Sequence, residues 1–366
     1  MVPSELIAIL FSGGVGQRLW PLSRRNTPKQ FVPLIGPKSS FELAVERLRS
    51  LVPSDGMFVA TNRQFGEMLR KLAPEIPAGN FILEPVRRDV AAAVALAFFS
   101  LQKDGRSEHV LFQWTDNYVK NAPRLLAAIR TAEHLLAANP NRVIFIGETP
   151  RFANENLGWI ELGDELGRID ETPYYAFRSW HYRPPKQVAA EMLASGRYIW
   201  NSGYFMSSIE FMTAAFRRLA PELASPIEEI VSYRGTSQES EKLDQIYPTV
   251  PALHFDEAIL ERLSVTEALL LQVDLGWSDP GSLYSLKEAL QESPEDNVSR
   301  GKVVAVATKD SLIYNDNPGK VVAVMGLEGI MVVDTPDVTL VIHKDAVRHL
   351  GELLSELAVK GWDEVL

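Results

Sequence analysis

Residues 6–31 decide the fold of this chain, and they run Leu6-Ile7-Ala8-Ile9-Leu10-Phe11, then Ser12-Gly13-Gly14-Val15-Gly16-Gln17-Arg18-Leu19-Trp20-Pro21-Leu22-Ser23-Arg24-Arg25, and after two residues Pro28-Lys29-Gln30-Phe31. Six apolar residues in a row, bounded by Ser-Gly-Gly, are typical of a parallel strand buried on both faces. Three glycines within four positions let the backbone approach a ligand closely and offer its N–H groups to an anion. The stretch therefore predicts a buried strand followed by an anion-binding loop.

Positive charge is concentrated in the same part of the chain. No acidic residue lies between Glu5 and Glu42, although the formal net charge of the whole protein is -10. Five basic residues fall in this interval: Arg18, Arg24, Arg25, Lys29 and Lys38. A local basic cluster in an acidic protein indicates a site for an anionic ligand.

The glycine-rich loop fits neither of the two common nucleotide-binding loops. The glycine, lysine and Ser/Thr spacing of a P-loop is absent. Leu19 stands where a dinucleotide fingerprint has its third glycine, and no acidic residue follows at the expected distance. Glycine-rich turns also occur in α/β proteins for packing reasons alone, so the glycines taken singly leave a purely structural role open.

The loop resembles the signature of the sugar-1-phosphate nucleotidylyltransferases, and specifically their mannose-1-phosphate guanylyltransferase branch, through Trp20-Pro21-Leu22-Ser23-Arg24 and Pro28-Lys29-Gln30-Phe31. The resemblance covers nearly the whole chain and is strongest at residues 12–31, 200–205 and 276–281. It implies transfer of a nucleotidyl group from a nucleoside triphosphate, expected to be GTP, to a sugar 1-phosphate, expected to be mannose 1-phosphate. The products would be GDP-mannose and pyrophosphate, the cofactor Mg²⁺, and the oligomer a homodimer.

The resemblance also implies roles for residues of the triphosphate half. Arg18 and Lys29 are the expected catalytic cations. The expected nucleotide-binding residues are Gly13, Gly14, Gly16, Gln17, Glu84 and Arg87. Asp116, after a strand, and Asp279, in a Gly-Trp-Ser-Asp turn, are the expected metal ligands, since two carboxylates with phosphate oxygens suit Mg²⁺. A lone aspartate after a strand is otherwise more often a turn or cap residue.

The sugar half of the resemblance contains most of the departures. The expected sugar-phosphate residues are Gly147, Asn156, Arg183 and Asn201. The family usually has glycine at Asn156, and a glutamate at Tyr182 that touches sugar hydroxyls. Other departures are Asp89 and Val90, in place of Asn-Thr, and Asn117. Two alternatives therefore stay open: a nucleotidylyltransferase for a different sugar 1-phosphate, or a catalytically weak regulatory homologue that binds nucleotide sugars.

Composition excludes several classes of protein. The chain has 366 residues, 46% of them hydrophobic and 23% charged, which is ordinary for a soluble globular protein. The absence of cysteine excludes disulfides, thiolate nucleophiles and cysteine-bound zinc. An acidic balance argues against nucleic-acid binding, and the longest apolar runs are too short for a membrane span. The start of the chain lacks the basic segment of a signal peptide, so a cytoplasmic protein is expected.

Short apolar runs at residues 57–60, 80–83, 109–113 and 142–147 alternate with helical segments such as residues 91–101. This pattern predicts an α/β fold with a Rossmann-like mixed, mainly parallel sheet and helices on both faces. Ser39 and Glu42 predict a capped helix after the basic loop.

Residues 1–295 are expected to form the catalytic domain. Residues 296–366 are expected to form a small domain of stacked β-structure with a helix at about 345–360, and the resemblance implies that this part is used for dimerisation. No internal repeat long enough to suggest a solenoid is expected.

Overall fold

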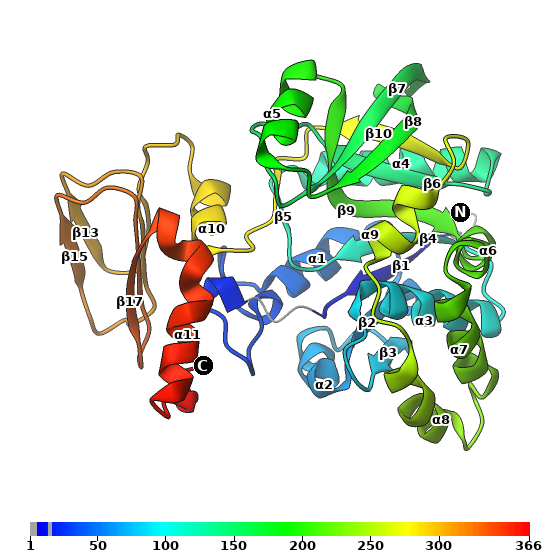
Figure 1. Ribbon diagram of the computed structural model, residues 1–366, viewed down its shortest axis with the longest axis horizontal. Helices are drawn as coiled ribbons and strands as arrows, with labels where there is room; N and C mark the ends of the chain where they lie inside the picture. The colour runs from blue at the N-terminus through cyan, green and yellow to red at the C-terminus, as the bar shows by residue number, and fades with distance from the viewer. Residues whose placement is uncertain (1–5, 14–16) are drawn as a thin grey trace. The chain divides into compact units, whose positions relative to one another are not determined.

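The computed structural model of the protein describes residues 6–13 and 17–366, and of Gln17 it describes the backbone alone. The chain packs as two compact units, each treated by itself below. Unit 1 consists of Met1–Gly13, Ala44–Trp114 and Lys120–Gly276, and unit 2 of Gly14–Leu43, Thr115–Val119 and Trp277–Leu366. Figure 1 labels the helices and strands in chain order. Residues 277–295 pack with unit 2, so the packing units divide the chain after Gly276. The functional boundary expected after residue 295 stays a prediction.

Unit 1 is built on a nine-stranded sheet with strand order β3-β2-β1-β4-β9-β6-β10-β8-β7. Its strands are β1 (Leu6–Phe11), β2 (Met57–Asn62), β3 (Phe81–Glu84), β4 (His109–Trp114), β6 (Val143–Glu148), β7 (Gly158–Ile169), β8 (Thr172–Tyr182), β9 (Tyr198–Ser208) and β10 (Ala268–Val273). β1 pairs in parallel with β2 and β4, whereas β9 runs antiparallel to both β4 and β6. All six residues of β1 are buried, as the uninterrupted apolar run predicts. The predicted α/β class with a mixed sheet is confirmed.

Helices cover both faces of this sheet. They are α2 (Arg63–Leu72), α3 (Asp89–Lys103), α4 (Ala122–Ala138), α5 (Lys186–Ser195), α6 (Ile209–Leu219), α7 (Pro221–Ser232), α8 (Glu239–Ile246) and the short α9 (Phe255–Ala258). Side chains of α3, α6 and α7 share one apolar core with Ile7, Ile9 and Phe11 of β1. α4 packs against β6, β9 and β10 on the opposite face. α3 is rich in alanine, so it can lie close to both α6 and α7.

α1 (Ser40–Leu48) follows the basic loop and starts with the predicted cap. Ser39 Oγ accepts a hydrogen bond of 3.2 Å from the backbone N–H of Glu42, and Glu42 Oε2 accepts one of 2.8 Å from the backbone N–H of Ser39. These reciprocal bonds satisfy two donors that the first helical turn leaves without partners. The predicted helix start is confirmed.

Unit 2 contains small sheets built from stacked turns of chain. Its elements are β5 (Tyr118–Val119), β11 (Trp277–Ser278), α10 (Leu283–Leu290), β12 (Val298–Arg300), β13 (Val303–Val306), β14 (Leu312–Asn315), β15 (Val322–Met325), β16 (Ile330–Asp334), β17 (Thr339–His343) and α11 (Leu350–Val359). β13 pairs in parallel with β15, and β14 pairs in parallel with β12 and β16. The stacked β-structure predicted for the C-terminal part of the chain is thus confirmed. The helix predicted over residues 345–360 divides into a 3₁₀ segment, Lys344–His349, and α11.

The expectation of no solenoid-like repeat is wrong. The strands β13 and β15 stack in parallel with Val303 opposite Val322, and β14 and β16 stack with Leu312 opposite Met331, so the turns repeat every 19 residues. The chain therefore coils through successive turns that present equivalent strands. The run Lys-Val-Val-Ala-Val occurs at residues 302–306 and again at 320–324, but its two copies are 18 residues apart and lie one residue out of register in the stack, so this identity does not mark the structural repeat.

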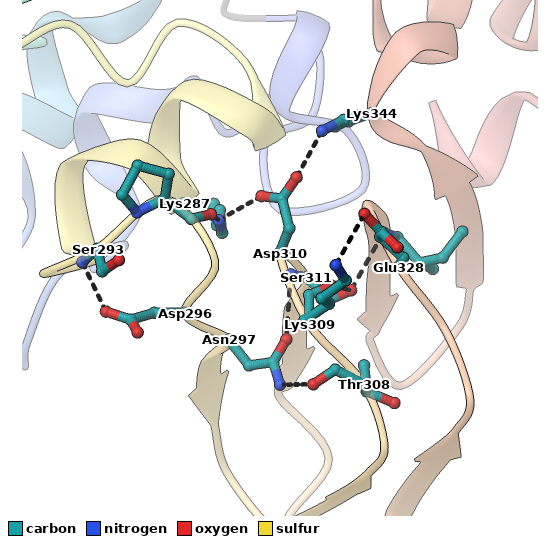
Figure 2. A network of polar contacts seen from close by, with 12 residues as sticks. Lys287, Ser293, Asp296, Asn297, Thr308, Lys309, Asp310, Ser311, Glu328 and Lys344 are labelled. Carbon is teal, nitrogen blue, oxygen red and sulfur yellow. Dashed lines mark hydrogen bonds and ion pairs between the residues drawn. The ribbon is translucent and has the colours of Figure 1, made fainter.

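A polar network ties these turns to α10 (Figure 2). Lys287 of α10 is fully buried, donates a 2.7 Å hydrogen bond to the carbonyl of Pro294, and forms an ion pair with Asp310. Lys344 reaches the other carboxylate oxygen of Asp310 at 2.5 Å. The network fixes the segment between α10 and β14 from both sides.

No helix in the described part of the chain is both long and apolar enough to cross a membrane.

Candidate active site

A buried lysine in unit 2 joins two carboxylates that are far apart in the sequence. Lys29 begins a 3₁₀ turn, Lys29–Phe31, and its side chain is 8% exposed. Its Nζ lies 2.9 Å from Asp116 Oδ2 and 3.1 Å from Asp279 Oδ1. The two carboxylates stay 39% and 40% exposed. The structure thus brings three of the predicted site residues into one cluster, with its cation enclosed and its anions open.

The pairing of β5 with β11 brings the two carboxylates together. Ser278 lies opposite Tyr118 in this antiparallel pair, and Trp277 lies opposite Val119. Asp116 precedes the first of these short strands and Asp279 directly follows the second. Antiparallel strands place the start of one beside the end of the other, so both aspartates lie at the same end of the pair.

The charge of Lys29 is stabilised by its partners. Burial acts to lower the pKa of the ammonium group, but the ion pairs and hydrogen bonds with Asp116 and Asp279 outweigh burial and raise the pKa above its ordinary value of 10.5. Lys29 is therefore a permanent cation at any working pH. The cluster retains one negative charge in excess, on carboxylates that solvent can reach.

Gly281 lies close to this cluster and to Arg18. A Cβ atom at this position would lie 3.3 Å from both carboxylate oxygens of Asp279 and 3.6 Å from Nη2 of Arg18. The exposed Arg18, from the 3₁₀ turn Gln17–Leu19, therefore has its guanidinium near the carboxylate of Asp279. A small pocket also adjoins Lys29, and its polar lining includes Lys38, Asp116 and Asn117.

The cluster fits a hard divalent cation. Mg²⁺ in proteins is usually held by one or two carboxylates and completes its shell with water and phosphate oxygens. Asp116 and Asp279 offer such a pair, and among residues 6–13 and 17–366 no group of three or more His, Asp or Glu side chains could form a closed metal cage. A metal at these carboxylates would keep coordination positions for a phosphate ligand.

The glycine loop itself is described only at its edges. Gly13 is exposed at the end of β1, with open space where a Cβ would lie. Gly14, Gly16 and the side chain of Gln17 lie outside the described residues.

In unit 1, Glu84 is a buried carboxylate at the C-terminal end of β3. It accepts a 2.7 Å hydrogen bond from the hydroxyl of Tyr247, which is fully buried. Burial raises the pKa of Glu84 to about 7, against the opposing effects of the Tyr247 hydrogen bond and the nearby Arg87 charge. The predicted pair Glu84 and Arg87 therefore interacts. Tyr247 was not foreseen from the sequence, since a tyrosine before a proline shows no signal of its own.

Asp89, one of the departures from the family pattern, begins α3 with a backbone φ of 60°. Its side chain accepts a 2.8 Å hydrogen bond from the backbone N–H of Val90. Aspartate tolerates the left-handed region better than most residues because its short side chain can bond locally in this way.

Two predicted sugar-side residues of unit 1, Gly147 of β6 and Asn201 of β9, lie opposite each other, and Gly158 of β7 lies opposite Tyr182 of β8. A Cβ on Gly147 would lie 2.2 Å from a methyl carbon of Ile199, so this position requires glycine. A Cβ on Gly158 would lie 3.2 Å from that of Asn201, which places the two strand pairs side by side.

Asn156 lies in the exposed loop before β7, and its backbone N–H donates a 2.9 Å hydrogen bond to the side chain of Asn154. Its φ is not positive, so an asparagine fits here without backbone strain. The loop is tied to the sugar-side positions because the N–H of Arg183 donates a 3.1 Å hydrogen bond to the carbonyl of Leu157.

Arg183 is held in an unusual conformation next to Tyr182. Its φ is 48°, and its guanidinium lies 4.9 Å from the centre of the Tyr182 ring. The Tyr182 hydroxyl lies 2.8 Å from Nε2 of His254, the residue before α9. Sequence reasoning assigned no chemistry to this segment and missed His254. The only local signal was a histidine two residues before an aspartate.

The model of the nucleotidyl transferase family matches residues 7–296. The chain belongs to this family. The model of a MannoseP isomerase/GMP-like beta-helix domain matches residues 301–357, the region of the stacked turns. The family predicted from residues 12–31 is therefore confirmed.

Several other nucleotidyltransferases resemble this chain over nearly its whole length. Mannose-1-phosphate guanylyltransferase RfbM of Salmonella typhimurium is 30% identical over 96% of this chain and 72% of its own. Mannose-1-phosphate guanylyltransferase 2 of Escherichia coli O157:H7 is 29% identical over 98% of this chain and 75% of its own. The crystal structure of a Thermus thermophilus protein described as mannose-1-phosphate geranyltransferase superposes with a TM-score of 0.83 at 30% identity, covering 97% of this chain and 99% of that one.

Proposed function

We propose that this nucleotidyltransferase is a mannose-1-phosphate guanylyltransferase, which transfers GMP from GTP to mannose 1-phosphate and releases pyrophosphate. The observation that carries the proposal is the cluster in which Lys29 contacts both Asp116 and Asp279. The relatives named for this activity, which match nearly the whole chain, support the choice of base and sugar.

The reaction asks little covalent chemistry of the protein. A phosphate oxygen of the sugar 1-phosphate attacks the α-phosphorus of the triphosphate, and the bond from that phosphorus to the pyrophosphate oxygen breaks. No general base is needed, because a phosphate monoester is already ionised at neutral pH. Both reactants are anions, so rate enhancement comes from in-line positioning and from charges aimed at the reacting phosphate.

Residues of the basic loop have the matching roles. The N–H groups of Gly13, Gly14 and Gly16 and the guanidinium of Arg18 bind the β- and γ-phosphates. Lys29 neutralises charge at the α-phosphate, and its partners keep it protonated throughout the cycle. Gln17, Glu84 and Arg87 are the further residues proposed to bind the nucleotide, and within unit 1 Glu84 is held in place by Tyr247.

Asp116 and Asp279 are the residues that would hold Mg²⁺. Bound there, the ion supplies additional neutralisation of triphosphate charge. The excess negative charge of the Lys29 cluster, on carboxylates that are 39% and 40% exposed, supports this assignment.

On the sugar side, Arg183 binds the phosphate of the sugar 1-phosphate, with Gly147, Asn156 and Asn201 around it. One observation favours a second candidate, a transferase for a different sugar 1-phosphate. Tyr182 is engaged with His254 and cannot offer the charged acceptor that a carboxylate would. The choice of sugar therefore depends on this pair.

The protein is further proposed to act in the cytoplasm as a homodimer formed through its C-terminal part. Val304, Val306, Val321 and Met325, on or next to β13 and β15, are between 49% and 73% exposed, which leaves an apolar face of the kind that interfaces cover. Sedimentation of the wild-type protein and of Val306→Glu tests this proposal, since the substitution should give a monomer.

Pyrophosphate release measured over a grid of nucleoside triphosphates and sugar 1-phosphates tests the activity. The highest kcat/KM is expected with GTP and mannose 1-phosphate, and the reaction should stop when Mg²⁺ is chelated. A higher kcat/KM with another sugar would favour the second candidate. Binding of GDP-mannose without turnover on any pair would instead support a regulatory homologue.

A further inference from the structure

Tyr182, His254 and Asp256 form a chain of polar groups in unit 1. The Tyr182 hydroxyl lies 2.8 Å from Nε2 of His254, and Nδ1 of His254 lies 3.4 Å from Oδ2 of Asp256. The His254 side chain is 30% exposed and that of Asp256 14%. The backbone N–H of Tyr182 is also held, by a 3.1 Å hydrogen bond to Glu261. The ring of Tyr182 is thus fixed at both ends while part of it stays accessible.

This chain borders the sugar-side positions. Tyr182 pairs with Gly158, which lies against Asn201, and the Tyr182 ring stacks under the guanidinium of Arg183. A ligand phosphate on Arg183 would bring its sugar ring close to the Tyr182 hydroxyl. The proposal below therefore rests on the proposed function, which places the sugar phosphate on Arg183.

Two polar neighbours of Tyr182 are poorly suited to accept a hydrogen bond from a sugar hydroxyl. Arg183 carries donors alone. The side-chain oxygen of Asn201 already accepts a 2.8 Å hydrogen bond from the N–H of Gly203. The phenol oxygen of Tyr182 can provide an acceptor, on the condition that its own proton is directed elsewhere.

His254 decides where that proton points. With a proton on Nδ1, facing Asp256, the neutral imidazole accepts the phenol proton at Nε2 and leaves the phenol oxygen free to accept. When His254 is doubly protonated, Nε2 donates to the phenol oxygen, and the phenol proton turns outward. The same tyrosine is then a donor instead of an acceptor.

Charged groups from several elements act on the pair. Those acting on His254 or Tyr182 are Asp256 and Glu257 of α9, Asp89 at the start of α3 and Arg183 at the end of β8. The carboxylate of Asp256, 3.4 Å from Nδ1, raises the pKa of His254 above its ordinary value of 6.5, in spite of burial. Burial raises the pKa of Tyr182 to about 12, so the phenol keeps its proton.

We propose that Tyr182 is a specificity-determining residue that accepts a hydrogen bond from a hydroxyl group of the hexose phosphate, and that His254 is the positioning residue that makes the tyrosine an acceptor. A neutral, switchable acceptor takes the place that a fixed carboxylate would occupy. The preferred substrate is therefore a sugar 1-phosphate with a free hydroxyl directed at Tyr182.

Tyr182→Phe isolates the hydroxyl, because the ring and its contact with Arg183 remain. At pH 8.5 the KM for mannose 1-phosphate should rise about tenfold, with kcat and the KM for GTP unchanged. At pH 6 the ratio of the two KM values, variant to wild type, should approach one, since the wild-type hydroxyl no longer accepts. The phosphate group of the substrate also ionises in this pH range, but it affects the KM of both enzymes equally and therefore cancels in their ratio. Tyr175→Phe, on the same strand but bonded to the surface residue Glu165, is the matched control and should leave all constants unchanged.

His254→Gln tests the positioning role. Glutamine keeps a hydrogen-bonding group near the phenol but does not titrate. The ratio of the KM for mannose 1-phosphate in His254→Gln to that in Tyr182→Phe should be the same at pH 6 and at pH 8.5. Equal KM values for wild type and Tyr182→Phe at both pH values, or a ratio that is the same at both, would overturn the proposal.

A measurement without turnover separates this proposal from the proposed function. Calorimetry of mannose 1-phosphate binding at pH 8.5 should show about tenfold weaker binding to Tyr182→Phe than to wild type. If binding weakens in this way and no nucleotide is transferred, the subsite stands and the proposed activity fails. If nucleotide is transferred and binding is unchanged, the activity stands and the role of Tyr182 fails.

Discussion

Unit 2 contains two clusters centred on a buried lysine, and they differ in what the partners leave open. In one, Lys29 meets two carboxylates that are 39% and 40% exposed. In the other, Lys287 shares the single carboxylate of Asp310, which is 11% exposed, with Lys344 (Figure 2). The first cluster has an excess of negative charge facing solvent. The second has an excess of positive charge and turns its only anion inward.

A buried lysine is therefore no sign of catalysis by itself. Lys287 also donates to the carbonyl of Pro294, so its donors are used within the fold. Hydrogen bonds and ion pairs with Lys287 and Lys344 lower the pKa of Asp310 in spite of its burial. Such an arrangement holds segments together and has no capacity to bind a further ion. The Lys29 cluster retains that capacity, because its two carboxylates are 39% and 40% exposed and can still coordinate a cation.

The largest expected effect comes from the open carboxylates. Asp279→Asn and Asp116→Asn should each lower kcat by at least about a thousandfold at saturating Mg²⁺, because the metal loses a charged ligand. Metal titrations of turnover and circular dichroism of the fold measure this. Asp244→Asn, which alters a similarly exposed carboxylate paired with Arg63, should have no effect on turnover. Full activity of both site variants at limiting Mg²⁺ would show that the pair does not hold the metal.

Removing Lys287 should affect the stability of the protein and not its catalytic activity. Lys287→Met should lower the free energy of unfolding by about 3 kcal/mol, because Asp310 stays buried with one partner fewer. Lys344→Met, where the lysine is 32% exposed, should cost about 1 kcal/mol or less. Denaturant unfolding gives both values. Under conditions in which the variants are folded, their kcat/KM should equal that of wild type. A loss of activity in the folded variants would show that the Lys287 cluster also takes part in catalysis.

Lys29→Ala should show the opposite pattern. We expect kcat/KM to fall at least about a hundredfold, equivalent to about 2.7 kcal/mol, since a cation is lost from the developing phosphate charge. Arg18→Ala should show a fall of the same order. Stability should change by less than about 1 kcal/mol, because the half-exposed aspartates can hydrate. Lys309→Ala, at an exposed ion pair with Glu328, is the control. A near-normal rate in Lys29→Ala would remove the cluster from the reaction.

The smallest effect concerns Glu84, a buried carboxylate whose hydrogen-bond partner, Tyr247, is neutral. Tyr247→Phe removes the hydroxyl bonded to Glu84 and should cost about 1 kcal/mol of stability. The pKa of Glu84 is about 7 in the folded protein against an ordinary 4.5, so the folded state retains a proton that the unfolded chain releases. Stability should thus fall as pH rises from about 4.5 to about 7. Unfolding measured at pH 5 and pH 8 should show this decrease in wild type and not in Glu84→Gln.

Much of the fold could be predicted because its signals are local. The run Leu6–Phe11, the cap at Ser39 and Glu42, and the apolar strands after residue 302 depend on neighbours a few residues away. The coil of stacked turns was missed, since each turn needs its neighbour to bury an apolar face and a short repeat shows little of this. Similarly, nothing near Tyr247 or His254 in the sequence indicates their partners.

The sequence by itself determined the family, the α/β class and the residue types of the proposed phosphate site, because a strand, a glycine loop and a basic run are specified by adjacent residues. Only the tertiary structure decided which charges meet. The pairing of β5 with β11 places Asp116 and Asp279 on one ammonium, and the position of α9 sets His254 against Tyr182. Contacts of this kind join residues separated by long stretches of chain, so they depend on strand register and helix packing, which no local pattern specifies.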